Sequence, residues 1–141
     1  MSTLEFVPFP GKRPFPPRVS TFTRPFWDAL DSGRLMTTRC GDCGQFSFPP
    51  RPLCRACWSE KIQWVELKQE GTLYSFTRVH VVPRAFGKEI PYCIGVVDLA
   101  DGVRFLCRMV GEVTPVAIGK RIRVVVAKYD DGPLFAARLA P

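Results

Sequence analysis

The hydrophobic pattern changes character at about residue 71. From there onward, short segments rich in Val, Ile, Phe and Tyr alternate with turn signals, which is typical of β-strands. The segment Ala100-Asp101-Gly102 predicts a hairpin turn, and Pro115–Gly119 predicts a short helical turn. The pattern therefore predicts a mainly β chain whose residues 67–141 form a five-stranded barrel of the OB type. The five expected strands are Leu73–Val82, Tyr92–Leu99, Val103–Val110, Arg121–Lys128 and Leu134–Leu139.

Alternation within two of these strands predicts which side chains face the core. Successive side chains of a strand point to opposite faces. Where apolar and basic residues alternate, the apolar ones therefore lie on the inner face and the basic ones on the outer face. The expected inner residues are Val103, Phe105, Cys107 and Met109 on the third strand, and Ile122, Val124 and Val126 on the fourth. The expected outer residues are Arg104, Leu106 and Arg108, and Arg121 and Arg123.

The chain begins with an arm, residues 1–21, in which Pro and Phe recur. Proline at this density disfavours a helix and favours an extended path. Two interpretations stay open. The arm is either a loose tail, or it lays Phe6, Phe9 and Phe15 into grooves on its own body or on a partner.

Residues 22–33 predict a short helix. Thr23 is expected to cap it, Pro25 suits its first turn, and Gly33 suits the position after its end. Phe26, Trp27 and Leu30 form an apolar stripe at helical spacing. A helix this short needs a surface to pack on.

Residues 34–66 contain the strongest motif of the sequence. Two C-x-x-C pairs, Cys40 with Cys43 and Cys54 with Cys57, are separated by ten residues. Each pair presents two thiolates on one side of a tight turn, and Gly44 suits the positive φ that follows such a turn. Four thiolates close the coordination shell, so we predict a structural zinc ion in a ribbon. The alternatives are iron in a rubredoxin-like centre and a redox dithiol. Cys93 and Cys107 are expected to pack in the barrel core.

Composition and charge narrow the class of protein. The chain has 141 residues and a formal net charge of +7, which favours an anionic partner such as a nucleic acid or a phosphorylated small molecule. The N-terminal residues lack an apolar signal segment, and no apolar run reaches the length of a membrane span. We therefore expect a cytoplasmic protein whose paired cysteines bind metal rather than form disulfides.

Catalytic signatures are missing from the sequence. It contains no G-x-S-x-G elbow and no phosphate loop, and the single histidine, His80, has no local partner motif. Basic residues on the strands are more informative, because they could hold the phosphates of coenzyme A or, with Tyr74 and Phe76, a nucleic acid strand. An ordinary solvated surface is the plain alternative. The candidates are Arg78, Arg84, Lys88, Arg104, Arg108, Arg121 and Arg123.

The order of these motifs resembles a known family over about residues 22–141. The resemblance rests on the aromatic helix, Gly33-Arg-Leu, the two cysteine pairs, Phe48-Pro-Pro-Arg, Trp64-Val-Glu, Gly71-Thr-Leu-Tyr-Ser-Phe-Thr, Pro91-Tyr and Ile118-Gly119-Lys. The family consists of OB-fold proteins with a rubredoxin-like zinc ribbon, long catalogued as a domain of unknown function and associated with acyl-CoA.

The resemblance implies a non-catalytic accessory subunit of a thiolase-like or lipid-transfer-protein-like enzyme. In such a hetero-oligomer the partner carries the chemistry, as an acyltransferase, thiolase or retro-aldol lyase. The accessory subunit stabilises that partner and helps to hold the CoA ester. Two alternatives stay open: a module that binds single-stranded nucleic acid, and a free-standing enzyme that uses His80 or a barrel cysteine.

Overall fold

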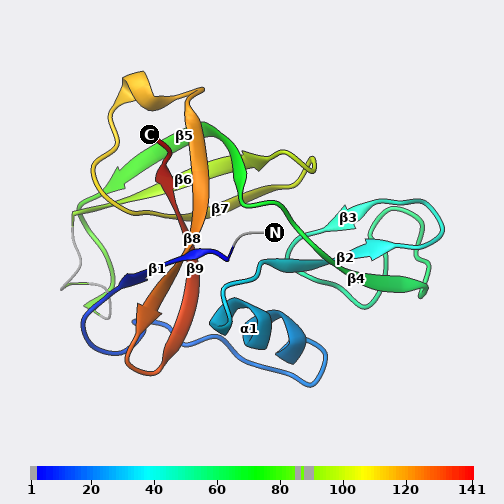
Figure 1. The fold of residues 1–141 in the computed structure, drawn as a ribbon. Helices are drawn as coiled ribbons and strands as arrows, with labels where there is room; N and C mark the ends of the chain where they lie inside the picture. Colours follow the sequence, from blue (N-terminus) through cyan, green and yellow to red (C-terminus); the bar gives the residue numbers. More distant parts are fainter. Residues whose placement is uncertain (1–2, 85–86, 88–90) are drawn as a thin grey trace.

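The computed structural model describes residues 3–84, 87 and 91–141 and arranges them as a barrel with a separate small sheet beside it (Figure 1). Within these residues, no helix has the length and apolar character that a membrane span requires. The elements in chain order are β1 (Glu5–Pro8), α1 (Arg24–Asp31), β2 (Met36–Cys40), β3 (Phe46–Ser47), β4 (Ile62–Glu66), β5 (Glu70–Val79), β6 (Tyr92–Leu99), β7 (Arg104–Met109), a 3₁₀ turn (Pro115–Ala117), β8 (Arg121–Tyr129) and β9 (Gly132–Leu139).

Strands β5 to β9 form the predicted five-stranded barrel. Antiparallel pairing joins β5 to β6, β6 to β7, β5 to β8, and β8 to β9, and the parallel pairing of Arg108 with Ala136 joins β7 to β9. The prediction of an OB barrel is therefore confirmed. Strand β5 starts at Glu70, before the predicted Leu73, and includes Gly71. A β-carbon at Gly71 would lie 2.2 Å from the carbonyl oxygen of Asp98, so glycine allows β5 and β6 to approach closely here.

The predicted alternation holds on β7 and only partly on β8. On β7, the expected inner residues are buried while Arg104 and Leu106 are exposed. On β8 the inner residues are also buried, but the outward-facing Val125, Ala127 and Tyr129 are buried as well. They form a second apolar cluster with Ala136, Val7 and Phe9. The arm covers this face, which explains why the pattern on β8 is apolar on both sides.

The N-terminal arm adds a strand to the barrel. Strand β1 pairs in parallel with the second half of β8, from Glu5 with Val125 to Pro8 with Lys128. The Phe9 ring lies on the Tyr129 ring, with centroids 5.1 Å apart. Phe9 thus docks on the body of its own chain, as one of the two interpretations expected, whereas Phe15 remains 68% exposed.

Arg13 fastens the end of the arm to the β8–β9 turn. Its backbone N–H donates to Asp131 Oδ1 at 2.8 Å, and its guanidinium donates to the carbonyl oxygens of Asp131 and Pro133. The backbone N–H of Asp130 donates to the carbonyl oxygen of Gly11. These contacts fix the arm at a point more than a hundred residues away in the sequence.

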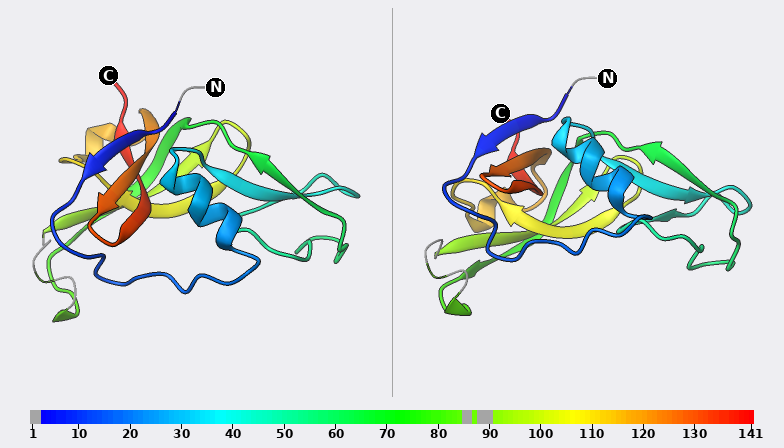
Figure 2. Two further views of the ribbon diagram at one scale, coloured as in Figure 1. Left: turned by 60° about the horizontal axis from the view of Figure 1, so that its bottom comes forward. Right: turned by 90° about the horizontal axis from the view of Figure 1, so that it is seen from below.

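Helix α1 lies between the barrel and the small sheet (Figure 2) and contacts β9 and β2. Phe26 and Leu30 are buried, and Gly33 has the positive φ expected after the end of a helix, +84°. Thr23 occupies the N-cap position as predicted, but its side chain makes no capping hydrogen bond to the helix. Thr23 Oγ1 accepts a hydrogen bond from the backbone N–H of Ser20 instead, at 2.8 Å.

Four phenylalanines join the helix, the small sheet and the barrel. Phe48, which follows β3, stacks on Phe105 of β7 with ring centroids 4.5 Å apart. Phe135 of β9 meets both of these rings edge to face, and Phe26 of α1 contacts Phe48 and Phe135. The aromatic cluster therefore ties three parts of the chain into one core.

Candidate metal centre and basic surfaces

The small sheet carries the two cysteine pairs and projects to one side of the barrel (Figure 1). Strand β2 lies in its middle and pairs with β3 and β4, as in Thr38 with Ser47 and Cys40 with Ile62. Cys40 ends β2 and Cys43 lies in the turn that follows it, while the loop between β3 and β4 holds Cys54 and Cys57. The sheet thus brings two turns that are distant in sequence face to face.

The four thiol sulfurs form one compact cluster, with all Sγ atoms within 4.8 Å of one another. The Sγ atoms of Cys40 and Cys57 are 3.5 Å apart, and so are those of Cys43 and Cys54. A tetrahedral zinc ion with Zn–S bonds of about 2.3 Å places its sulfurs about 3.8 Å apart. The cluster therefore has the size that a zinc ion requires. In the described part of the chain it is the one group of three or more metal-ligating side chains found close together.

Backbone N–H groups of the two turns point at the sulfurs. Asp42 and Cys43 donate to Cys40 Sγ, and Ala56 donates to Cys54 Sγ, at 3.3 to 3.4 Å. The bond from the Cys43 N–H lowers the pKa of the Cys40 thiol to about 6. At Cys57 the Ser59 N–H lowers the pKa, but the neighbouring sulfurs, first that of Cys40, outweigh it and raise the pKa to about 12. A divalent cation removes this conflict because it stabilises all four thiolates.

The residues around the cluster fit a structural zinc ion. Four protein ligands leave no open coordination position, so the metal supports the fold and does not activate a substrate. Gly44 has the expected positive φ, +77°. Arg39 lies beside the first turn, where its Nε donates to the carbonyl oxygen of Gly44 at 3.1 Å and offsets part of the negative charge of the thiolates.

The other two cysteines are buried in the barrel, as predicted. Cys93 and Cys107 are 4% and 6% exposed. Burial raises the pKa of the Cys107 thiol to about 12, so this residue is a protonated core side chain at neutral pH. His80 lies just after β5 and is exposed. These positions give no support to a free-standing Cys–His enzyme.

Two of the seven basic candidates line one hollow. Arg78 of β5 and Arg108 of β7 border a space of about 280 Å³ together with Phe9, Tyr92 and Glu112. The Arg108 guanidinium lies 5.0 Å from the centroid of the Phe9 ring and 4.9 Å from that of Tyr92. Arg78 forms an ion pair with Glu112 at 3.9 Å. The hollow therefore combines two cations, one carboxylate and aromatic rings.

The remaining candidates lie elsewhere. Arg104 pairs with Asp98 at 2.5 Å and stacks on Tyr74. The hydrogen bond to Asp98, and to a smaller extent Tyr74, raises the pKa of Arg104. The Arg121 guanidinium lies 3.9 Å from the Glu70 carboxylate. Arg123, two residues further along β8, is half-buried. Arg84 is exposed, and Lys88 lies outside the described residues. Among the described candidates, only Arg78 and Arg108 therefore line this hollow.

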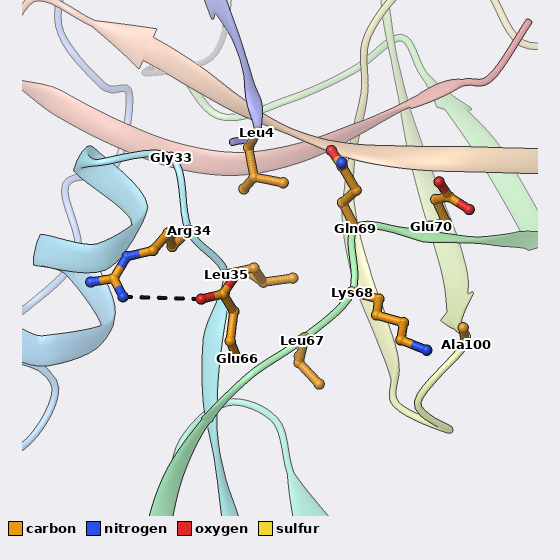
Figure 3. A pocket seen from close by; sticks show the side chains of 10 residues that line it. All are labelled: Leu4, Gly33, Arg34, Leu35, Glu66, Leu67, Lys68, Gln69, Glu70 and Ala100. Carbon is orange, nitrogen blue, oxygen red and sulfur yellow. Dashed lines mark ion pairs between the residues drawn. The ribbon is translucent and has the colours of Figure 1, made fainter. Parts of the chain in front are cut away.

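A further hollow, of about 440 Å³, lies where the arm, the helix and the linker between the two sheets meet (Figure 3). Leu4, Leu35 and Leu67 provide its apolar floor. Its rim carries charges of both signs, two of which, Arg34 and Glu66, form an ion pair at 4.0 Å. The balance of charge gives this hollow no preference for an anion.

Comparison with known proteins supports the assignment of both the zinc ribbon and the OB-fold barrel. Residues 27–63 match the family described as "ChsH2, rubredoxin-like zinc ribbon domain", and residues 64–127 match "ChsH2, C-terminal OB-fold domain". A solved structure titled "Ltp2-ChsH2(DUF35) aldolase" superposes with a TM-score of 0.75 and 29% sequence identity, over 89% of this chain and 100% of that one.

Two curated relatives have similar sequences. The benzoylsuccinyl-CoA thiolase subunit BbsA of Thauera aromatica is 35% identical, over 72% of each chain. The 3-oxo-4,17-pregnadiene-20-carboxyl-CoA hydratase alpha subunit of Mycobacterium tuberculosis is 35% identical over 85% of this chain, but only 38% of that protein is covered. The chain therefore spans well under half the length of the mycobacterial relative. With both family matches in their expected order, the chain belongs to the ChsH2 (DUF35) family of proteins that join a rubredoxin-like zinc ribbon to an OB-fold barrel.

Proposed function

We propose that this chain is a non-catalytic accessory subunit of a thiolase-like acyl-CoA enzyme, either an acyltransferase, a thiolase or a retro-aldol lyase. The observation that carries the proposal is its 35% identity, over 72% of both chains, to a protein named as a thiolase subunit. The fold shared with a chain of an aldolase titled Ltp2-ChsH2 supports the same role. In this role the chain stabilises a thiolase-like or lipid-transfer-protein-like partner in a hetero-oligomer.

The chemistry of the described residues suits a supporting role. Cys40, Cys43, Cys54 and Cys57 are the proposed ligands of a structural zinc ion, whose closed shell has no place for a substrate. The barrel cysteines are buried and therefore cannot act as exposed nucleophiles. The partner then has to supply the nucleophile or base. Reduced cysteines and a CoA substrate suit the cytoplasm as the compartment.

Within this role, we assign the phosphates of the CoA ester to the hollow between Arg78 and Arg108. Guanidinium groups bind phosphate through charge-assisted hydrogen bonds, and an aromatic ring such as Tyr92 offers a face for stacking. Arg104 suits this task less because Asp98 already lies against it at 2.5 Å, and Arg121 does not line this hollow. Neither Arg84 nor Arg123 lines this hollow, and Lys88 lies outside the described residues.

Complex formation tests the proposed function. The chain is co-expressed with the thiolase-fold protein encoded nearest its gene, purified through a tag on one of the two, and passed over a sizing column with light-scattering detection. The expected result is a stable hetero-oligomer of fixed stoichiometry. Separate elution of the two proteins at micromolar concentration contradicts the proposal.

A further inference from the structure

Trp58 adopts a backbone conformation that side chains usually avoid. Its φ is +64°, and it is the only residue other than glycine with a positive φ in the described part of the chain. It directly follows Cys57, just as Gly44 directly follows Cys43. The two positions are equivalent, because the Gly44 N–H donates to the carbonyl oxygen of Cys40 at 3.0 Å and the Trp58 N–H to that of Cys54 at 2.9 Å.

Glycine is the residue that this position favours. The left-handed conformation brings a β-carbon too close to the backbone, and glycine avoids this cost. The first turn uses glycine, at φ +77°, while the second turn uses a large aromatic residue in the same conformation. Strain of this kind persists only where the surrounding structure imposes it, and it is found most often at functional sites.

The side chain of Trp58 does not contribute to the core. It is 74% exposed, although tryptophan is among the side chains with most to gain from burial. Trp58 borders a hollow of about 350 Å³ together with Arg51, Pro52, Leu53 and Arg55. The adjacent cysteine cluster fixes the backbone on which this ring is presented.

Two arginines border the same hollow as Trp58. Arg51 and Arg55 are exposed, and neither takes part in an ion pair found within the described residues. An exposed aromatic ring flanked by arginines has the composition typical of protein–protein hot spots. Its complement is an apolar pocket with carboxylates on its rim.

We propose that Trp58 is the anchor through which the zinc ribbon docks into an apolar, acid-rimmed pocket of the catalytic partner. The inference rests on the proposed function, since that partner is the thiolase-like subunit. The ring fills the pocket, while Arg51 and Arg55 meet the carboxylates and steer the approach. The Trp58 surface, defined as Trp58, Arg51, Pro52, Leu53 and Arg55, gives the projecting ribbon a task beyond metal binding.

Substituting Trp58→Gly separates docking from folding. Glycine suits the positive φ, so the variant is expected to keep one zinc ion per chain and a melting temperature equal to or above that of the wild type. Its affinity for the partner, measured by calorimetry, is expected to fall at least tenfold. Trp58→Asn is a second variant that tolerates the same conformation and is expected to behave alike. The matched control is Val116→Ser on the 3₁₀ turn, because Val116 is also 74% exposed.

The outcomes distinguish the two levels of the proposal. If the wild-type chain binds the partner and Trp58→Gly binds it equally well, the docking inference is wrong and the proposed function stands. If the wild-type chain does not bind at all, the proposed function fails and the inference fails with it. Wild-type self-association, or binding of a single-stranded oligonucleotide, that Trp58→Gly abolishes while partner affinity is unchanged would assign the surface to another occupant and overturn the inference.

Charge reversal tests the arginines separately. The double substitution Arg51→Glu and Arg55→Glu is expected to weaken partner binding and to reduce its dependence on salt concentration. Unchanged affinity and an unchanged salt dependence would contradict the acidic rim of the pocket.

Discussion

The ring of Phe48, which follows the last strand before the second cysteine pair, stacks on the ring of Phe105 inside the barrel, with centroids 4.5 Å apart and planes tilted by 27°. Phe135 closes this contact from the side. The zinc ribbon is therefore packed directly onto the barrel core. A rigid connection of this kind suits a subunit that has to hold a partner in a defined orientation.

Phe48→Ala is expected to loosen this connection. Truncating a largely buried phenylalanine costs about 3 kcal/mol, at the low end for such changes because Phe48 keeps some exposure. Thermal unfolding should show a lower melting temperature, while metal analysis still finds one zinc ion per chain. Phe15→Ala, at a 68% exposed position, is the matched control and should leave the melting temperature unchanged. Equal stability of both variants would contradict the role of the aromatic cluster.

Cys40→Ser is expected to remove the metal. Loss of one thiolate opens the tetrahedral shell, and structural zinc contributes roughly 10–16 kcal/mol of apparent binding free energy in small zinc-finger peptides. Metal analysis should find less than one zinc ion per chain, and the environment of Trp64 on β4 should become more solvent-exposed by fluorescence.

Cys93→Ala provides the control for the metal prediction, since Cys93 is a core residue and the variant should keep its zinc. Full zinc occupancy in Cys40→Ser would show that the four-cysteine assignment is wrong. Iron in place of zinc, in protein purified from medium that contains both metals, would select the alternative metal.

Arg13→Ala is expected to destabilise the chain in a pH-dependent manner. The Arg13 backbone N–H and then its guanidinium lower the pKa of Asp131 below its usual value of about 3.9. A lowered folded-state pKa stabilises the fold above the unfolded value, and this contribution is lost as the pH falls through the folded value. The substitution keeps the backbone N–H and removes only the part of the lowering that the guanidinium supplies. This part should make the difference in melting temperature between wild type and variant larger at pH 7 than at pH 3.

The comparison for this variant is Lys12→Ala, at an exposed neighbouring position. The melting temperature of this variant should differ little from that of the wild type at either pH. A difference for Arg13→Ala that does not vary with pH would mean that only the bonds from Arg13 to backbone carbonyls matter.

Arg108→Gln is expected to weaken the binding of acyl-CoA to the complex. Loss of a charge-assisted hydrogen bond to phosphate, at about 1.5–3 kcal/mol, corresponds to roughly tenfold or more in affinity. Calorimetry on the assembled complex measures the effect. Arg104→Gln, on the same strand but paired with Asp98, should bind as the wild type does. Equal affinities of both variants would place the CoA phosphates elsewhere.

Local signals in the sequence predicted much of this protein. The C-x-x-C spacing predicted the two pairs of sulfurs, because each turn places its own two. The alternation from Val103 to Met109 predicted the inner and outer faces of β7, and Gly102 marked its hairpin, where φ is +84°. Each of these features depends on residues that are close together in the chain.

Features that depend on distant contacts were not predictable. Nothing in Glu5–Pro8 indicates that it pairs with β8, more than a hundred residues away, so the docking of the arm stayed open. Arg78 and Arg108 meet only because β6 lies between β5 and β7 in one register. Trp58 was missed because the glycine signal of the first turn is absent from the second. Comparing the two turns position by position could have revealed it.

Reconstitution of activity tests the central claim most directly. Acyl-CoA turnover is measured for the thiolase-like partner alone, for this chain alone, and for both proteins together at increasing ratios. An accessory subunit predicts no turnover by this chain, weak or unstable turnover by the partner, and full activity once the stoichiometric ratio is reached. Full and stable activity of the partner alone, unchanged by this chain, would contradict the accessory role.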